Sequence, residues 1–134
     1  MKISSSNFHA GPWFMKFAVV FGLVGMLMGI VMGAKHDFTL APVHAHINLI
    51  GWVSMFLAGL FYAVFPSAEG RQSFLHLILS VCGLVLFTPG IAASVMDLPW
   101  GVPVAIAGSM ITLLAMLLFA VIVWRSKGNI LVQT

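Results

Sequence analysis

The sequence contains very few charged residues, and this scarcity excludes most classes of soluble protein. Only 7% of its 134 residues are Asp, Glu, Lys or Arg, whereas 61% are hydrophobic. A typical soluble chain is about one quarter charged, because a surface in water needs polar groups to cover it. The composition and the mean hydropathy of +1.11 therefore predict an integral membrane protein.

Cysteine is almost absent, and basic residues are not clustered. The single cysteine, Cys82, lies in an apolar run, so no intrachain disulfide can form. The six basic residues are scattered along the chain and form no patch, which argues against nucleic acid as a partner. We expect the lipid bilayer itself to be the main surrounding of this chain.

Four apolar segments are long enough to cross a bilayer. They cover residues 13–33, 42–66, 73–96 and 102–124. A helix needs about 20 such residues to span a hydrocarbon core about 30 Å thick. The short polar breaks between the segments predict an all-α, up-down bundle of four transmembrane helices in a single domain over residues 1–134. No small-residue cleavage site follows the first segment, so we expect it to be a retained helix rather than a signal peptide.

The basic residues predict the orientation of the bundle. Five of them fall on one side of the membrane in an up-down arrangement: Lys2, Lys16, Arg71, Arg125 and Lys127. Lys35 alone falls on the other side. The positive-inside rule then places both termini in the cytoplasm of a multi-pass protein, which we expect in a bacterial inner membrane.

The first segment has glycines on one helical face. Gly25, Gly29 and Gly33 are spaced four residues apart, and Gly22 joins them. Small residues at this spacing let transmembrane helices approach closely. We therefore expect this face to contact another helix.

The second segment carries most of its polar and small residues on one stripe. At about 100° per residue, that stripe consists of His44, Asn48, Gly51, Met55, Ala58, Gly59 and Tyr62. Polar groups inside a membrane are costly and are functional candidates by default. His44 is therefore expected to face the bundle interior, whereas His46, about 160° away on the wheel, is expected to point outward.

The third segment has a similar stripe, formed by His76, Ser80, Gly83, Phe87, Gly90 and Ser94. In an antiparallel pair His76 comes level with Tyr62, and we expect these two side chains to form a hydrogen bond. The level of His44 is then roughly 27 Å away, at about 1.5 Å per residue. This separation argues against one heme held between His44 and His76.

The second segment resembles a known motif. The second transmembrane helix of subunit I in heme-copper oxidases has a histidine, a Gly-Leu pair, an aromatic residue and a terminal proline at similar positions. The matching residues here are His44, Gly59-Leu60, Tyr62 and Pro66. In that family this histidine ligates the low-spin heme near the outer face of the membrane. The resemblance implies a b-type heme ligated by His44.

The rest of that family's machinery has no counterpart in this chain. The helices that carry the copper ligands and the high-spin heme ligand are missing, so we do not expect oxygen reduction by one copy, and enzymatic activity stays open. Electron transfer with a redox partner protein, or gas sensing, is the expected role. The expected cofactor-binding residues are His44, His46, Asn48, Gly51 and Met55.

The heme would need a second axial ligand. Met28, Met32 and Met96 lie at a suitable depth, and a histidine of a second copy is another source. Small bundles often complete sites by oligomerising, so we expect a homo-oligomer, with His46 near such an interface.

Two other functions fit the same residues. Thioether and imidazole ligands suit copper, and an outer-face copper site would use Met32, His36, His44, His46 and Met96. A cofactor-free structural subunit of a respiratory or transport assembly is the third alternative. In that case the histidines serve only as hydrogen-bonding residues within the bundle.

Overall fold

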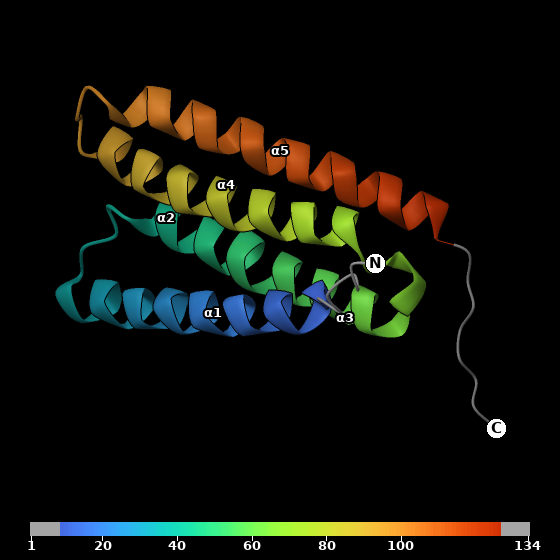
Figure 1. Ribbon diagram of the computed structural model, residues 1–134. Helices are drawn as coiled ribbons and strands as arrows, with labels where there is room; N and C mark the ends of the chain where they lie inside the picture. The colour runs from blue at the N-terminus through green and yellow to red at the C-terminus, as the bar shows by residue number, and fades with distance from the viewer. Residues whose placement is uncertain (1–8, 127–134) are drawn as a thin grey trace, which may run out of the picture.

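The computed structural model describes residues 9–126, and the regular structure in this range is entirely helical. The elements in chain order are α1 (Ala10–Lys35), α2 (Ala41–His46), the π-helix η1 (Ile47–Ser54), α3 (Met55–Val64), the short 3₁₀ turn η2 (Pro66–Ala68), α4 (Arg71–Val95) and α5 (Gly101–Arg125). α2, η1 and α3 follow one another without a break and form one rod. Four helical rods thus run back and forth (Figure 1).

All four rods are long and apolar enough to cross a membrane. Their limits differ from the sequence-based spans by a few residues. The first helix begins at Ala10 rather than at residue 13. The second ends at Val64 rather than at Pro66, because Phe65 leaves the helical region at φ −117° and ψ 73°. A residue before proline is disfavoured in helical geometry, and Pro66 then starts η2.

The second rod contains a π-helix that the sequence did not predict. η1 spans eight residues in the middle of the rod, directly after the two histidines of α2. π-helices are rare and occur frequently at functional sites. The helical wheel assumed a uniform α-helix, and it therefore does not describe this part of the rod.

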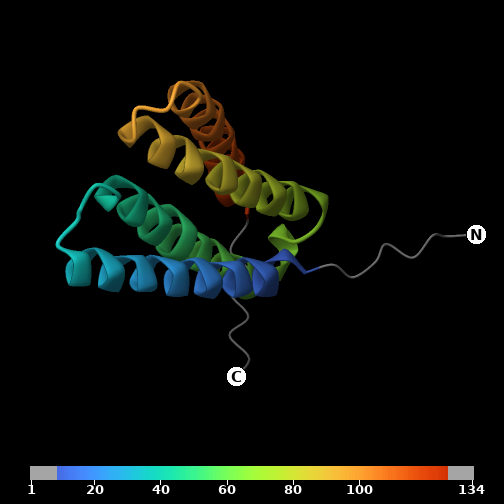
Figure 2. The same ribbon diagram turned by 90° about the vertical axis from the view of Figure 1, so that its left-hand side faces the viewer.

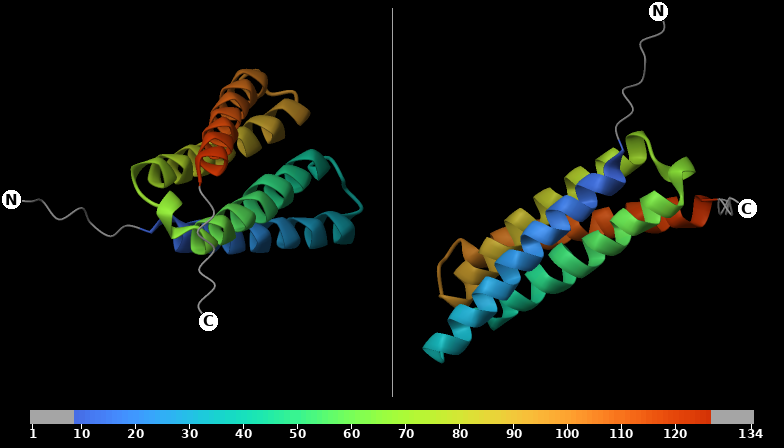
Figure 3. Two further views of the ribbon diagram at one scale, coloured as in Figure 1. Left: turned by 90° about the vertical axis from the view of Figure 1, so that its right-hand side faces the viewer. Right: turned by 90° about the horizontal axis from the view of Figure 1, so that it is seen from below.

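The rods are arranged as two hairpins rather than as an evenly packed bundle. α1 pairs with the rod of α2, η1 and α3, whereas α4 pairs with α5 along its length. The two hairpins are inclined to each other, as Figures 2 and 3 show from three directions. α4 and α5 approach very closely, since a Cβ added at Gly90 or Gly108 would meet backbone atoms of the other helix.

The glycine face of α1 contacts the second rod, as the sequence predicted. A Cβ added at Gly22 would meet Trp52, one at Gly25 would meet Asn48, and one at Gly29 would meet His44. Gly33 differs, because apart from its own stretch of helix no atom of the described residues lies within 4 Å of the position of its Cβ. The prediction was therefore right for the first three glycines and wrong for Gly33.

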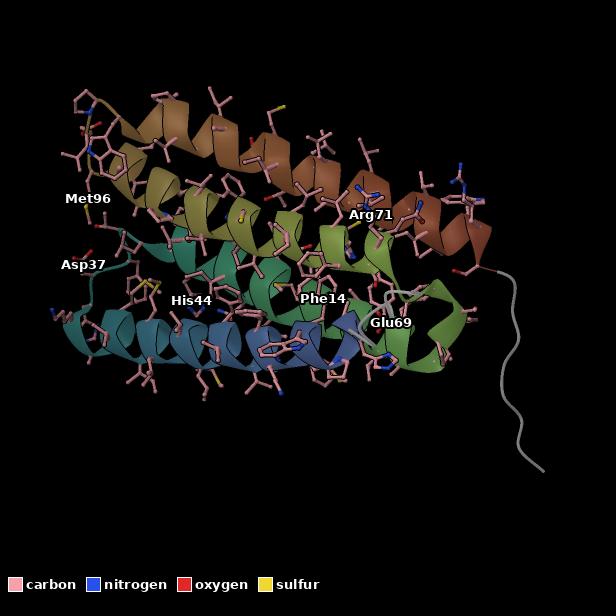
Figure 4. All side chains as sticks on the ribbon, viewed as in Figure 1. Phe14, Asp37, His44, Glu69, Arg71 and Met96 are labelled. Carbon is pink, nitrogen blue, oxygen red and sulfur yellow. The ribbon has the colours of Figure 1, made fainter. Side chains whose placement is uncertain are left out.

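The two ends of the bundle are packed differently. We call the end with the start of α1, η2 and the end of α5 the Glu69 end, and the opposite end the Asp37 end (Figure 4). The main cluster of buried apolar residues lies toward the Glu69 end and consists of Ala10, Phe14, Ala18, Met55, Ala58, Tyr62, Leu77 and Ile122. His44 lies nearer the Asp37 end, outside this cluster.

Candidate functional site

His44 of α2 is held against α1. Its side chain is half-buried, and its Nδ1 atom lies 2.9 Å from the backbone oxygen of Gly25. The ring occupies the space that a side chain at Gly29 would fill, since a Cβ there would lie 2.9 Å from His44 Cε1. The glycines of α1 therefore make room for the imidazole and supply its hydrogen-bond partner.

This contact determines which ring nitrogen of His44 carries the proton. A backbone carbonyl can only accept a hydrogen bond, so Nδ1 must donate, and in the neutral ring Nε2 keeps a lone pair. Asn48 Nδ2 carries two N–H groups: one donates to the His44 backbone oxygen at 2.8 Å, and the atom also lies 3.5 Å from His44 Nε2, which makes a long hydrogen bond at most. His44 thus presents the Nε2 lone pair of an oriented ring, and the hydrogen bond to this lone pair is the long one from Asn48.

The other cofactor-binding residues predicted on this stripe do not surround His44. Gly51 packs between the other helices, where an added Cβ would lie 2.6 Å from Leu84 Cδ2 and 2.9 Å from Phe21 Cβ. Met55 is only 2% exposed and belongs to the apolar cluster toward the Glu69 end. Of the predicted stripe, only Asn48 contacts the His44 ring.

His46 lies on a different side of α2 from His44. Its Nδ1 atom is 2.7 Å from the backbone oxygen of Pro42, and its ring meets the Phe87 ring of α4 edge-on at 4.9 Å between centroids. The expectation that His46 points away from the bundle was wrong, because the ring packs on α4. The expectation that the two histidines face different directions was right.

The remaining metal-ligand candidates are spread over the Asp37 end. His36 is exposed and ends α1 in the left-handed conformation, Met32 is 8% exposed within α1, and Met96 is 52% exposed after α4. Within residues 9–126, no three His, Cys, Asp or Glu side chains are placed to hold one metal ion. The structure therefore does not bring His36, His44 and His46 together.

The loop at the Asp37 end is fixed locally by its own side chains. Asp37 accepts hydrogen bonds from the Thr39 hydroxyl at 2.6 Å and from the Thr39 amide at 3.0 Å. These bonds lower the pKa of the Asp37 carboxyl from its ordinary value. Asp37 is thereby a fixed anion in the loop that leads into α2.

The Tyr62 and His76 side chains form the hydrogen bond expected from the sequence. Tyr62 Oη lies 2.9 Å from His76 Nδ1, and both residues are buried, at 1% and 4% exposure. The His76 ring is enclosed by Phe14 of α1 and Phe119 of α5, with centroid distances of 4.7 Å and 4.8 Å. Side chains of all four rods thus meet around this pair at one level.

His44 and His76 lie at different levels of the bundle. His44 meets α1 at Gly29, whereas His76 meets α1 at Phe14. These contacts are fifteen residues apart on one helix, which corresponds to roughly 22 Å at about 1.5 Å per residue. One heme cannot bridge the two histidines within one copy of the chain.

Glu69 has a structural role that the sequence interpretation missed. Its two carboxylate oxygens accept hydrogen bonds from the backbone amides of Ala10 and Gly11, each at 2.8 Å. Ser73 of α4 donates to the same carboxylate at 2.8 Å. The first amides of a helix have no partner within it and favour a negative charge, so Glu69 caps α1 and joins the two hairpins. Its partners lie 58 and 59 residues away, and no local pattern signals them.

The comparisons with known proteins provide no further guide. The chain matches no family model, no curated protein and no solved structure.

Proposed function

We propose that this chain is a multi-pass protein of the bacterial inner membrane that binds a b-type heme through His44. Bound heme would supply a one-electron iron centre or a site for a diatomic gas, which supports a role in electron transfer or gas sensing. In the electron-transfer role, the heme would exchange electrons with a redox partner protein. We include in this proposal the resemblance of the second rod to the second transmembrane helix of subunit I in heme-copper oxidases.

The hydrogen bond from His44 to Gly25 carries the proposal. Histidines that ligate metals usually donate their other ring N–H to a carbonyl or carboxylate, which fixes the tautomer and the ring orientation. His44 has this arrangement, with Nδ1 2.9 Å from the Gly25 oxygen and Nε2 left with its lone pair.

Heme suits a site that offers one oriented imidazole. The porphyrin supplies four of the iron ligands, and the protein adds only one or two axial ones. His44 provides one axial ligand per copy, and a second copy of the chain would provide the other, which makes a homo-oligomer part of the proposal. The copper alternative requires ligands to converge, and no contact among the described residues favours it over heme.

The orientation of the protein is also part of the proposal. Lys16, Arg71 and Arg125 lie toward the Glu69 end, and Lys35 lies at the Asp37 end. Lys2 and Lys127, on which the sequence interpretation also relied, lie outside the described residues. The positive-inside rule supports a cytoplasmic Glu69 end and both termini in the cytoplasm, with His44 toward the outer face.

A visible spectrum of the protein purified from heme-replete cells tests heme binding. We expect a Soret band that disappears in His44→Ala and persists in His36→Ala, because His36 is an exposed histidine of the adjacent loop. His46→Ala should also keep the band, since its ring packs on Phe87 instead of lying beside His44. A wild-type protein without a Soret band, or a band that survives His44→Ala, would refute the assignment.

The oligomeric part has its own test. Light scattering coupled to gel filtration and a heme assay should give a dimer with one heme per two chains. A heme-loaded monomer would contradict the shared site while leaving ligation by His44 intact.

A further inference from the structure

A cavity of about 430 Å³ lies between the two hairpins, toward the Glu69 half of the bundle. Its walls come from η1 and α3 on one side and from α4 and α5 on the other, and Phe14 of α1 also lines it. The lining residues on α5 extend from Ser109 to Phe119, a length of about 15 Å along the helix. The cavity is therefore elongated along the helix axes.

Most of the cavity wall is apolar, and each hydroxyl group in it already donates its proton in a hydrogen bond within the protein. Ser54, Ser80, Ser109 and Thr112 each donate a hydrogen bond to a carbonyl of their own helix, at 2.8–2.9 Å. In the part of the chain that the structure describes, no hydroxyl of this wall is thus left with a free donor. His76 is the other polar residue of the lining.

The contact with Tyr62 determines what His76 offers to this cavity. The only bond that the Tyr62 hydroxyl makes within the described range is to His76 Nδ1, at 2.9 Å. A buried hydroxyl normally donates its proton, so Tyr62 donates, Nδ1 accepts, and the imidazole proton resides on Nε2. No described residue accepts a bond from Nε2, although His76 is 96% buried and lines the cavity. A single N–H donor is thus left for a ligand.

The lining also restricts the charge of the ligand. No Lys, Arg, Asp or Glu is among the lining residues, and an unpaired charge away from water is very costly. His76 lies five residues after Arg71, the first residue of α4, which is about 7.5 Å along the helix axis. A phospholipid head group, which is charged and stays at the surface, does not fit. The wall suits a neutral, largely apolar molecule with a hydrogen-bond acceptor.

We propose that this cavity binds a neutral, lipid-soluble ring compound with a carbonyl oxygen, a class that includes p-quinones, and that this carbonyl accepts a hydrogen bond from His76 Nε2. The ring and the start of its tail lie along the apolar wall of Met55, Leu113 and Met116. The proposal concerns binding alone. It does not depend on heme, since His44 and the cavity use different residues and different levels of the bundle.

Calorimetric titration of the full-length protein in lipid nanodiscs tests this site with two matched probes. The first is a p-benzoquinone with a decyl tail, and the second is decylbenzene, which has the tail and a ring but no carbonyl oxygen. Wild-type protein should bind the quinone saturably and about five- to tenfold more tightly than decylbenzene, the effect of one neutral hydrogen bond. Equal affinities, or no saturable binding of the quinone, would overturn the proposal and indicate adventitious lipid-tail binding only.

Removal of the donor should remove this preference. The double variant Tyr62→Phe with His76→Phe keeps two rings in the core and leaves no hydroxyl without a partner. It should bind the quinone and decylbenzene equally well. A quinone preference that persists in this variant would refute the role of His76.

Filling of the cavity provides a test that does not alter the buried core. Ser109→Phe adds bulk to the cavity wall, and Met110→Phe adds bulk at the next residue, which is 54% exposed and outside the lining. The first variant should lose quinone binding, and the second should bind as wild type does. Unchanged binding in Ser109→Phe would place the site elsewhere. His44→Ala should bind the quinone normally, so failure of the heme proposal and failure of this one are distinguishable.

Discussion

The regions around His44 and His76 use the same side chain in opposite ways. His44 donates its Nδ1 proton to a carbonyl of α1 and leaves a lone pair on Nε2, whereas His76 accepts the Tyr62 proton on Nδ1 and leaves an N–H on Nε2. The first ring therefore presents an acceptor at Nε2, and the second presents a donor there. The partner of Nδ1 determines the chemistry of the opposite nitrogen.

The surroundings of the two rings differ as well. His76 is enclosed by aromatic rings beside the main cluster of buried apolar residues. His44 is half-buried on a face of glycines, where its ring takes the place of side chains that α1 lacks. Substitution of the first residue should therefore affect stability, and substitution of the second should affect ligand binding.

The largest expected effect on stability is that of His76→Ala. The change empties a space among Phe14, Phe119 and Tyr62, and it leaves a buried hydroxyl without its acceptor. Cavity formation and an unpaired polar group together cost about 3–5 kcal/mol. Equilibrium unfolding in mixed detergent should show this loss. His44→Ala should cost clearly less, and equal losses in the two variants would contradict the comparison.

The next effect is expected at the glycine face of α1. Gly29→Ala places a methyl group 2.9 Å from His44 Cε1, so the imidazole must shift from its position. Overpacking of this kind costs about 1–3 kcal/mol, and we expect weaker heme binding in a Soret titration. Gly33→Ala is the matched control, because apart from its own stretch of helix a Cβ there meets no atom of the described residues within 4 Å. An unshifted titration in Gly29→Ala would show that the close contact does not position the ring.

A smaller effect is expected from the carboxylates at the two ends. Glu69→Ala removes the partner of two amides of α1 and of Ser73, and loss of such a cap costs about 1–2 kcal/mol. Thermal unfolding followed by circular dichroism should show the loss. Asp37→Ala is the control, because within residues 9–126 the Asp37 carboxylate accepts hydrogen bonds only from Thr39, in an exposed loop. If Asp37→Ala lost as much stability as Glu69→Ala, the hydrogen bonds of Glu69 between the hairpins would not be the cause of the loss.

The smallest effect should be visible only by spectroscopy. The ¹⁵N chemical shifts of the imidazoles should assign the proton to Nδ1 in His44 and to Nε2 in His76. Tyr62→Phe removes the donor to Nδ1 of His76 and should give a mixture of tautomers there, while His44 stays unchanged. Identical tautomers in the wild-type protein would remove the contrast between the two histidines.

Much of the fold could be predicted because the membrane restricts the choices. Apolar length determined the four helices, and antiparallel geometry placed Tyr62 level with His76, where the two side chains form their bond. The rotation of each rod about its axis was harder to predict. It depends on contacts such as Gly22 with Trp52 and on the π-helix, neither of which has a periodic signal. For this reason His46 was expected on the outside but packs on Phe87.

The candidate site was only partly accessible from the sequence. His44 and Asn48 were expected together, and they are in contact, whereas Gly51 and Met55 belong to the packing of other helices. The tautomers of His44 and His76 could not be inferred, because each depends on one atom of another residue at hydrogen-bond distance. The role of Glu69 also depends on the close approach of chain segments that are distant in sequence.

The cap on α1 also has a consequence for how the protein is made. The amides of Ala10 and Gly11 receive their partner from Glu69, which the ribosome adds only after α1 itself and the second helical rod have been synthesised. Until then, the start of the first helix has no carboxylate to neutralise it. The final docking of the two hairpins is thereby coupled to the order of synthesis, and the first helix reaches its finished state only when the third begins.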